Sequence, residues 1–260
     1  MISWAQRWRR QAIRWAGDGV DLLFPPRCRW CRGEEDPTSH GLCAVCTREF
    51  ADGRERCTRC GAAGSAASDA GCGGCRRRQP AWDGIVVLGG YGDALRSAVL
   101  RMKRPGAEDL TRALATLLVD RHRALLERTR VDGVVPVPMH WWRRTCRGTS
   151  AADELAAAVA RELGVDAVSA LVRSRATPMQ NELPAEDRGD NVAGAFRVRK
   201  DVAGRRLLVV DDVVTTGSTL DACCRALQAA GAAGVHVAAI AKADRWGDDS
   251  EHDSERGASA

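Results

Sequence analysis

The chain has no long apolar segment. None of its runs of consecutive apolar residues approaches the roughly 18 that a membrane-spanning helix requires. Near the N-terminus, where a secretory signal would place its apolar region, the sequence is interrupted by Arg7, Arg9, Arg10 and Arg14. We therefore expect a cytoplasmic protein without a membrane span.

Aromatic residues are scarce as well. They make up 5% of the 260 residues, and most of them are tryptophan. Hydrophobic residues at 45% and charged residues at 28% are typical of a globular protein. The length suffices for one domain of ordinary size and a smaller module. The net charge of +5 is mild, so it suits an anionic ligand without requiring nucleic acid.

Cysteine, in contrast, is abundant. Eight of the 11 cysteines form four C-x-x-C pairs, which are Cys28 with Cys31, Cys43 with Cys46, Cys57 with Cys60, and Cys72 with Cys75. Eleven residues separate the first two pairs, and eleven separate the last two. In a cytoplasmic chain this spacing indicates metal rather than disulfides. Cys146, Cys223 and Cys224 lie outside the pattern and are interpreted as ordinary buried or loop thiols.

The cysteine pairs predict two structural zinc ions. Each C-x-x-C turn places two thiolates on one side of a tight loop, and two such turns complete the tetrahedron that zinc prefers. A redox or iron–sulfur role is the alternative. The spacing leaves open whether neighbouring pairs share an ion or whether the first pair joins the third.

Four segments follow from the composition. Residues 1–24 are predicted to form an amphipathic helix with Trp4, Trp8 and Trp15 on one face, which packs on its own protein or touches a membrane surface or a partner. Residues 25–80 form the zinc-binding module, which has too few large apolar residues to fold unaided. Residues 81–245 form the main domain, and residues 246–260 form an acidic, disordered tail.

Strands and helices alternate in the main domain. The pattern predicts strands over 84–91, 133–137, 167–172, 205–210 and 235–241, and helices over 93–102, 110–127, 151–163 and 220–230. Such alternation is typical of an α/β fold in which a parallel sheet is flanked by helices.

A second motif follows the apolar strand at 205–210. It reads Asp211, Asp212, Val213, Val214, Thr215, Thr216, Gly217, Ser218, Thr219 and leads into a helix. Amides at a helix start form an anion site, and the hydroxyls donate to phosphate oxygens. Carboxylates suit sugar hydroxyls, so the motif predicts a ligand with both a ribose diol and a phosphate. Simple capping of the helix is the alternative interpretation.

Several basic residues are candidate ligands for a pyrophosphate group. They are Lys103, Arg104, Arg143, Arg144 and Arg147. A solvated basic face is the alternative for the arginines, and Lys103 also suits a helix C-terminus. The segment 174–195 has no clear periodicity, and a loop of that length is typical of a lid that excludes water from a reactive centre.

With these motifs, the chain resembles the ComF family of competence-associated proteins from about Asp21 to Ala243. The resemblance rests on the Asp211–Thr219 motif, the run Leu22–Cys28 before the zinc module, the run Val135–Pro138, and the segment Arg173–Gln180 with Asn191 and Gly194–Phe196. It implies a type I phosphoribosyltransferase-like core with a small N-terminal zinc-ribbon-like module, phosphoribosyl pyrophosphate as ligand, Mg²⁺ with the pyrophosphate, and a role in DNA uptake. The chain departs from the family at Arg147-Gly148-Thr149-Ser150-Ala151, where members usually read Arg-Gly-Phe-Asn-Gln.

Two functions are compatible with these observations. In the first, the protein is a phosphoribosyltransferase in which Asp211 and Asp212 are the catalytic pair that holds the ribose, and residues 215–219 hold the 5′-phosphate. In the second, it is a non-catalytic accessory protein of the DNA-uptake machinery that binds a nucleotide sugar or single-stranded DNA. Trp30, Trp141 and Trp142 would then stack on bases, although core packing is the alternative for them.

Overall fold

The computed structural model describes residues 25–36, 41–64, 71–139, 150–173 and 194–243. The predicted N-terminal helix, the C-terminal tail, the arginines at 143, 144 and 147, Cys146 and most of the predicted lid lie outside these residues. Among the helices that are described, none has the length and apolar composition needed to cross a bilayer.

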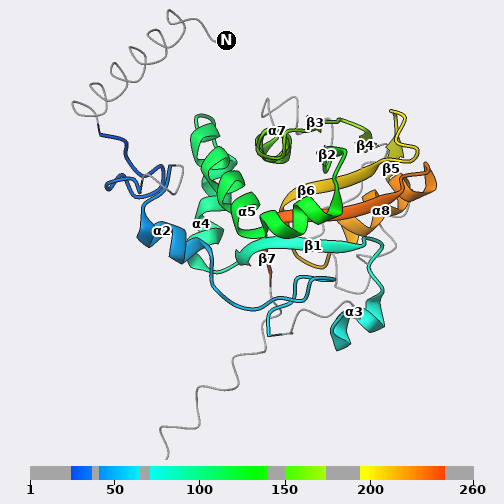
Figure 1. Ribbon diagram of the computed structural model, residues 1–260, viewed down its shortest axis with the longest axis horizontal. Helices are drawn as coiled ribbons and strands as arrows, with labels where there is room; N and C mark the ends of the chain where they lie inside the picture. Colours follow the sequence, from blue (N-terminus) through cyan, green and yellow to red (C-terminus); the bar gives the residue numbers. More distant parts are fainter. Residues whose placement is uncertain (1–24, 37–40, 65–70, 140–149, 174–193, 244–260) are drawn as a thin grey trace, which may run out of the picture.

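A parallel five-stranded sheet forms the centre of the main domain (Figure 1). Its order is β1 (Gly84–Gly90), β7 (Gly234–Lys242), β6 (Arg206–Val214), β2 (Gly133–Pro136) and β3 (Asp166–Ala167). In the central register, Val209 of β6 lies opposite Val135 on one side and Val237 on the other. The sheet confirms the predicted fold class.

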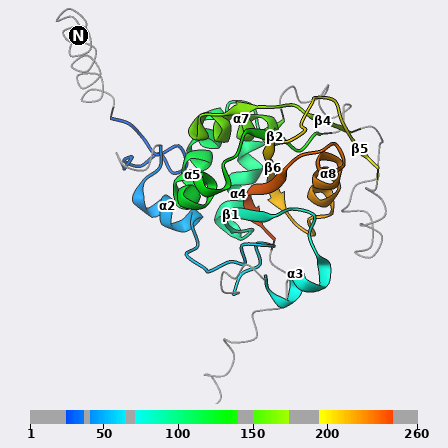
Figure 2. The ribbon, with the colours of Figure 1, turned by 45° about the vertical axis from the view of Figure 1, so that its right-hand side comes forward.

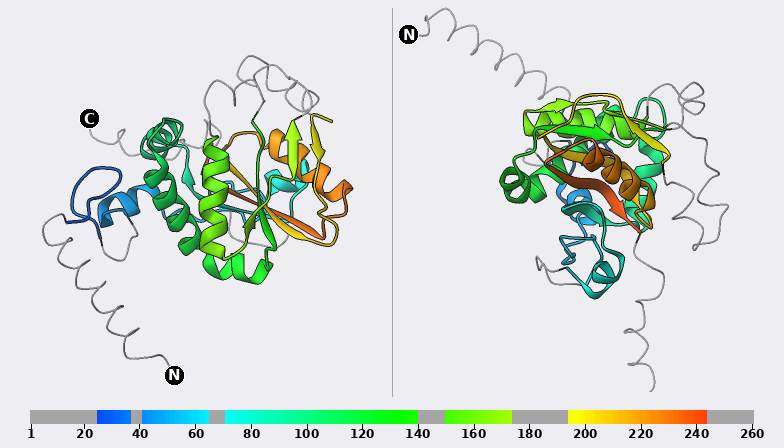
Figure 3. Two further views of the ribbon diagram at one scale, coloured as in Figure 1. Left: turned by 90° about the horizontal axis from the view of Figure 1, so that it is seen from above. Right: turned by 90° about the vertical axis from the view of Figure 1, so that its right-hand side faces the viewer.

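Helices cover both faces of the sheet (Figure 3). Leu208 and Val210 of β6 face the cluster that contains α4 (Asp93–Met102), α5 (Glu108–Thr129) and α7 (Ala151–Leu163). Leu207 and Val209 face the opposite cluster, which contains α8 (Ser218–Ala229). This alternation follows from the two-residue period of a strand whose two faces are both buried.

The single strand predicted over 167–172 is wrong. The structure instead has β3, which pairs with β2, and a separate strand β4 (Leu171–Arg173), which pairs antiparallel with β5 (Phe196–Val198). The amide of Ala170 donates to the carbonyl of Val168 at 2.7 Å, so the chain turns between the two strands. This turn carries β4 out of the main sheet.

The cysteine-rich segment consists of two similar ribbons. Each begins with a tight hairpin, marked by the bridges Arg27–Glu34 and Arg56–Ala63, and ends in a short helix, α2 (Ala44–Phe50) or α3 (Gly73–Arg78). Figures 1 and 2 show α2 beside α4 and α5, and α3 well apart from it, near one end of β1. The two ribbons therefore contact different parts of the main domain.

Candidate functional site

The eight cysteines form two tetrads. Cys28, Cys31, Cys43 and Cys46 make the first, and Cys57, Cys60, Cys72 and Cys75 make the second, with all sulfur atoms of a tetrad within 4.8 Å of one another. Neighbouring pairs therefore share a site, and the alternative pairing of first with third does not occur. All ten described cysteines are free thiols.

The sulfur positions suit a zinc ion. A tetrahedron of thiolates with Zn–S bonds of about 2.3 Å has sulfur–sulfur edges of about 3.8 Å. The structure has 3.7 Å from Cys31 to Cys43, 3.8 Å from Cys57 to Cys75 and 3.5 Å from Cys60 to Cys72. Each tetrad thus has the size of a four-thiolate zinc site.

In each tetrad, hydrogen bonds lower the pKa of some thiols and so favour the thiolate form that zinc binds, whereas burial and neighbouring cysteines raise the pKa of Cys46, Cys60 and Cys75. Burial opposes ionisation of Cys28, but hydrogen bonds from backbone amides, chiefly those of Cys31 and Cys43, outweigh it and lower the pKa of this thiol to about 7. Burial likewise opposes ionisation of Cys72, and hydrogen bonds from the amide of Cys75 and the thiol of Cys60 prevail, lowering the pKa of Cys72 to about 6.

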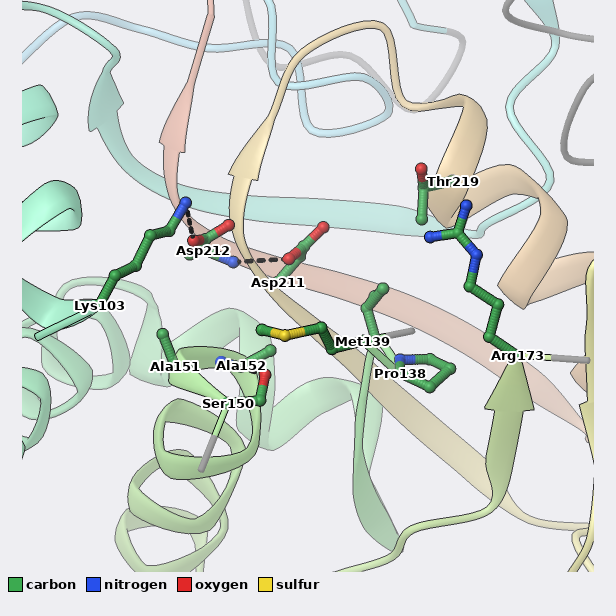
Figure 4. Close-up of a pocket in the computed structure, with 11 residues that line it drawn as sticks. Lys103, Pro138, Met139, Ser150, Ala151, Ala152, Arg173, Asp211, Asp212 and Thr219 are labelled. Atoms are coloured by element: carbon green, nitrogen blue, oxygen red, sulfur yellow. Dashed lines mark hydrogen bonds and ion pairs between the residues drawn. The ribbon is translucent and has the colours of Figure 1, made fainter. Parts of the chain in front are cut away.

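A cavity of about 240 Å³ opens at the carboxyl ends of β6 and β2 (Figure 4). Open parallel sheets bind ligands at this edge. The cavity is lined by Lys103, Val137, Pro138, Met139, Ser150, Ala151, Ala152, Arg173, Asp211, Asp212 and Thr219. It therefore joins four of the predicted ligand-binding residues, namely both acids, Thr219 and Lys103.

The two acids differ in their surroundings. Asp212 forms an ion pair with Lys103, whose Nζ lies 2.7 Å from Oδ2, and its amide donates to Asp211 Oδ1 at 2.9 Å. Desolvation in the cavity raises the pKa of the Asp211 carboxyl well above its ordinary value, and the adjacent charge of Asp212 raises it further. The pair therefore combines an ion-paired carboxylate with a carboxyl group that holds its proton more tightly.

The segment after the acids differs from the prediction. Strand β6 continues through Val213 and Val214, which still pair with β7, so these two residues are not part of a loop. The turn consists of Thr215 to Thr219, and we call it the phosphate loop. Residue Gly217, at φ +81°, is the N-cap of α8 and has no side chain with which to cap the helix. Thr216 Oγ1 nevertheless accepts a hydrogen bond from the amide of Ser218 at 3.5 Å, so one threonine of the motif contacts the helix start, as the capping interpretation predicts.

Arg173 is a cavity residue that the sequence did not identify. It ends β4, and its guanidinium lies 5.7 Å from the centroid of the Phe196 ring of the paired strand. Figure 4 shows Arg173 beside Thr219, on the side of the cavity away from Lys103. Its position depends on the β4–β5 pairing, which joins residues far apart in the chain, so no local pattern marked it.

Two comparisons place the chain among known proteins. Residues 149–256 match the phosphoribosyl transferase domain, and residues 19–77 match the double zinc ribbon domain. The competence protein F of Haemophilus influenzae is 31% identical over 238 residues, which cover 85% of this chain and 99% of that protein. The DNA utilization protein YhgH of Escherichia coli is 32% identical over 220 residues, which cover 83% and 96%. The chain belongs to the ComF family.

Solved structures add only a partial likeness to this ComF-family protein. Phosphoribosylpyrophosphate synthetase from Mycobacterium smegmatis aligns with 52% of this chain and 33% of its own, at 20% identity and a TM-score of 0.31. A likeness of this size has no bearing on the site.

The departure from the usual ComF sequence falls on the cavity wall. Ser150 and Ala151, the positions at which the sequence resemblance implies Asn and Gln, both line the cavity. Ser150 is buried and caps α7, because its Oγ accepts a hydrogen bond from the amide of Ala152 at 3.3 Å. The wall opposite the acids therefore lacks the two amide side chains.

The raised pKa of Asp211 predicts a stability that falls as pH rises. Above the ordinary carboxyl pKa of about 3.9, the unfolded chain releases this proton while the folded protein retains it. Each pKa unit of difference lowers the stability by about 1.4 kcal/mol. We expect Asp211→Asn to be more stable than the wild type at neutral pH, with the difference vanishing near the unfolded pKa, in urea unfolding curves recorded across pH. Asp212→Asn is the matched control, because it relieves only the part of the Asp211 shift that comes from the Asp212 charge and also loses the pair with Lys103, so its gain should be smaller; equal gains in both variants would contradict the assignment.

Proposed function

We propose that the cavity binds phosphoribosyl pyrophosphate and that the protein is a phosphoribosyltransferase. The observation that supports this is the meeting of two adjacent carboxyl groups and a helix start at one cavity. Carboxylates accept hydrogen bonds from the ribose hydroxyls, and the first amides of α8 attract the 5′-phosphate. The pyrophosphate would enter as its Mg²⁺ complex, since hard oxygen ligands suit that ion.

The proposed reaction requires no protein nucleophile. A bond forms from an acceptor atom to C1 of the ribose while the bond from C1 to the pyrophosphate oxygen breaks, and pyrophosphate leaves with the electron pair. Lys103 and Arg173 supply positive charge on two sides of the cavity, with the sequence-predicted Arg143, Arg144 and Arg147 as further candidates. Preorganised charges of this kind stabilise a leaving anion without reorganisation.

Calorimetry with phosphoribosyl pyrophosphate tests the proposal. The wild-type protein should bind the ligand only when Mg²⁺ is present, and saturation should raise the melting temperature. At a ligand concentration of 100 times Kd, the folded state gains about 2.7 kcal/mol. Release of pyrophosphate in the presence of a panel of bases and nucleotides would then establish turnover. Absence of Mg²⁺-dependent binding at millimolar ligand would contradict the proposal.

The names of the relatives support a second function in DNA handling. We infer that the protein contacts single-stranded DNA during uptake, with its arginine run and its ribbons. Of the three tryptophans considered for stacking, Trp30 packs edge-on against Phe50 at 5.5 Å and lies under Arg101, so its ring is engaged in packing. Trp141 and Trp142 lie outside the described residues. Stacking of Trp141 and Trp142 on bases stays a prediction.

Fluorescence anisotropy with a labelled single-stranded oligonucleotide tests the DNA proposal. Each contact to a single-stranded phosphate contributes about −0.7 to the slope of log K against log salt concentration. Replacing both Arg143 and Arg144 by alanine should therefore flatten this slope by about 1.4 if each arginine contacts one phosphate. An Arg123→Ala variant is the control, because Arg123 pairs with Asp120 on α5 and is not a candidate. No binding at low salt would contradict the proposal.

A further inference from the structure

The second ribbon contacts the segment that leads into β1. The amide of Ile85 donates to the carbonyl of Thr58 at 2.8 Å, and the indole Nε1 of Trp82 donates to the carbonyl of Arg59 at 2.7 Å. Both carbonyls belong to the residues between Cys57 and Cys60. The backbone that carries two sulfur atoms of the second tetrad is therefore bonded directly to residues 82–85.

The same segment contacts the phosphate loop and α8. Trp82 is 4% exposed, and a Cβ built on Gly217 would lie 2.9 Å from its Cη2 atom, so the ring lies directly against the glycine backbone. The amide of Ala81 donates to Asp221 Oδ1 at 2.7 Å, and Gln228 Nε2 donates to the carbonyl of Ala81 at 2.5 Å. Residues 81 and 82 therefore lie between the second tetrad and the helix start that forms the candidate phosphate site.

The first ribbon has no comparable contact among the described residues. Its Arg29 pairs with Asp109 at 3.6 Å, and Arg101 donates to the carbonyl of Trp30 at 3.1 Å, so it rests on α4 and α5. Its buried Phe50 belongs to the core cluster on that face, whereas Trp82 and Leu220 of α8 belong to the other. The two tetrads are thus chemically alike but differ in what they touch.

We propose that the second cysteine tetrad and Trp82 position the phosphate loop, whereas the first tetrad serves only the fold. This rests on the proposed function of the cavity. Zinc at the second tetrad would hold the carbonyl of Arg59, which fixes the indole, and the indole sets the position of Gly217. Trp82 touches no substrate atom in this arrangement and is a positioning residue.

Paired substitutions in the two ribbons test the proposal in the full-length protein. Cys60 and Cys31 hold the same place in their tetrads, so Cys60→Ser and Cys31→Ser should each lower the zinc content by about one ion. Only Cys60→Ser should weaken calorimetric binding of ribose 5-phosphate, by about tenfold, which corresponds to about 1.4 kcal/mol. Trp82→Leu should do the same, and Trp30→Leu, its matched control on the first ribbon, should not.

A milder variant and a double substitution separate positioning from a loss of fold. Trp82→Phe keeps an aromatic ring near Gly217 but loses the bond to Arg59, so its affinity should fall between those of wild type and Trp82→Leu. Gly217→Ala should weaken binding strongly in the wild type and less in the Trp82→Leu background, because the shorter side chain removes the collision. Far-UV circular dichroism and melting curves identify variants that do not fold. If Trp82→Leu is one of them, the affinity of Trp82→Phe tests the positioning role in its place.

The outcomes are distinguishable. Wild-type affinity in Trp82→Phe, Trp82→Leu and Cys60→Ser overturns the positioning role. Equal weakening of ligand binding by the substitutions in both ribbons also overturns the positioning role, because a general loss of stability would then explain the weaker binding. If the wild-type protein itself does not bind ribose 5-phosphate or phosphoribosyl pyrophosphate, the proposed function of the cavity is wrong instead.

Discussion

The purified protein should contain two zinc ions, and loss of either ion should unfold the ribbon that holds it. Apparent binding free energies of structural zinc are about 10–16 kcal/mol at neutral pH, and they act as folding free energy where no site exists before folding. Cys28 and Cys57 hold equivalent positions in the two tetrads, so Cys28→Ser and Cys57→Ser should each remove about one zinc ion. Elemental analysis measures the loss, and limited proteolysis locates the unfolded ribbon.

The two variants should differ in how far the damage spreads. Cys28, Cys46 and Phe50 belong to the core cluster that α4 and α5 share, so Cys28→Ser should also lower the melting temperature of the main domain. Cys223→Ala is the control for the loss of a buried thiol, because Cys223 is a fully buried residue of α8 and lies outside both tetrads. Metal-free protein whose ribbons still resist protease would contradict the zinc assignment.

The sequence predicted regular elements well where local signals were complete. The helices over 93–102 and 151–163 are confirmed at both ends, as α4 and α7. Ser150 before α7 and Gly164 after it are typical N-terminal and C-terminal caps, and the structure places them as such. The spacing also identified the eight cysteine ligands, because a C-x-x-C turn specifies its own geometry, whereas the structure was needed to show which pairs share a site.

The predictions from sequence were wrong where contacts with residues distant in the chain determine the local structure. Strand β6 runs on through both acids because β7 pairs with Asp211 and Val213, whereas the local sequence suggests a turn. The three-residue strands β4 and β5 are too short to show a period. Helices α2 and α3 each have a cysteine of a tetrad as their N-cap residue, Cys43 and Cys72, which is not one of the usual capping residues by which a helix start is predicted.

The contents of the cavity were predicted only in part, for the same reason. The acids and Thr219 are contiguous in sequence, so one motif identified them. Arg173 and Ser150 reach the cavity from elements whose placement depends on the whole sheet. The link through Trp82 is also tertiary, because it joins a ribbon carbonyl to a glycine more than a hundred residues away.

Replacing both acids of the cavity should abolish Mg²⁺-dependent binding of phosphoribosyl pyrophosphate. In Asp211→Asn with Asp212→Asn, the ribose hydroxyls lose both carboxyl groups while the shape of the cavity is kept. A hydrogen bond to the charged Asp212 contributes about 1.5–3 kcal/mol and one to Asp211, which holds its proton, about 0.5–1.5 kcal/mol, so the loss of both should weaken binding at least about thirtyfold. Melting curves should show that the variant remains folded, since neither residue belongs to a hydrophobic core cluster.

The anion site should survive this change, which makes the test specific. Lys103 loses its partner at 2.7 Å in the double variant, so the positive charge near the phosphate loop rises. Inorganic sulfate, which has no diol, should therefore bind at least as tightly as to the wild type, whereas ribose 5-phosphate should bind far more weakly. Thr216→Val should show no such selectivity. It removes a hydroxyl of the phosphate loop, so both ligands should weaken by a similar factor, about tenfold for one charge-assisted bond. If the double variant kept wild-type affinity for ribose 5-phosphate in calorimetry, the carboxyl groups would not hold the ribose, and the ligand of this cavity would be an anion without a sugar.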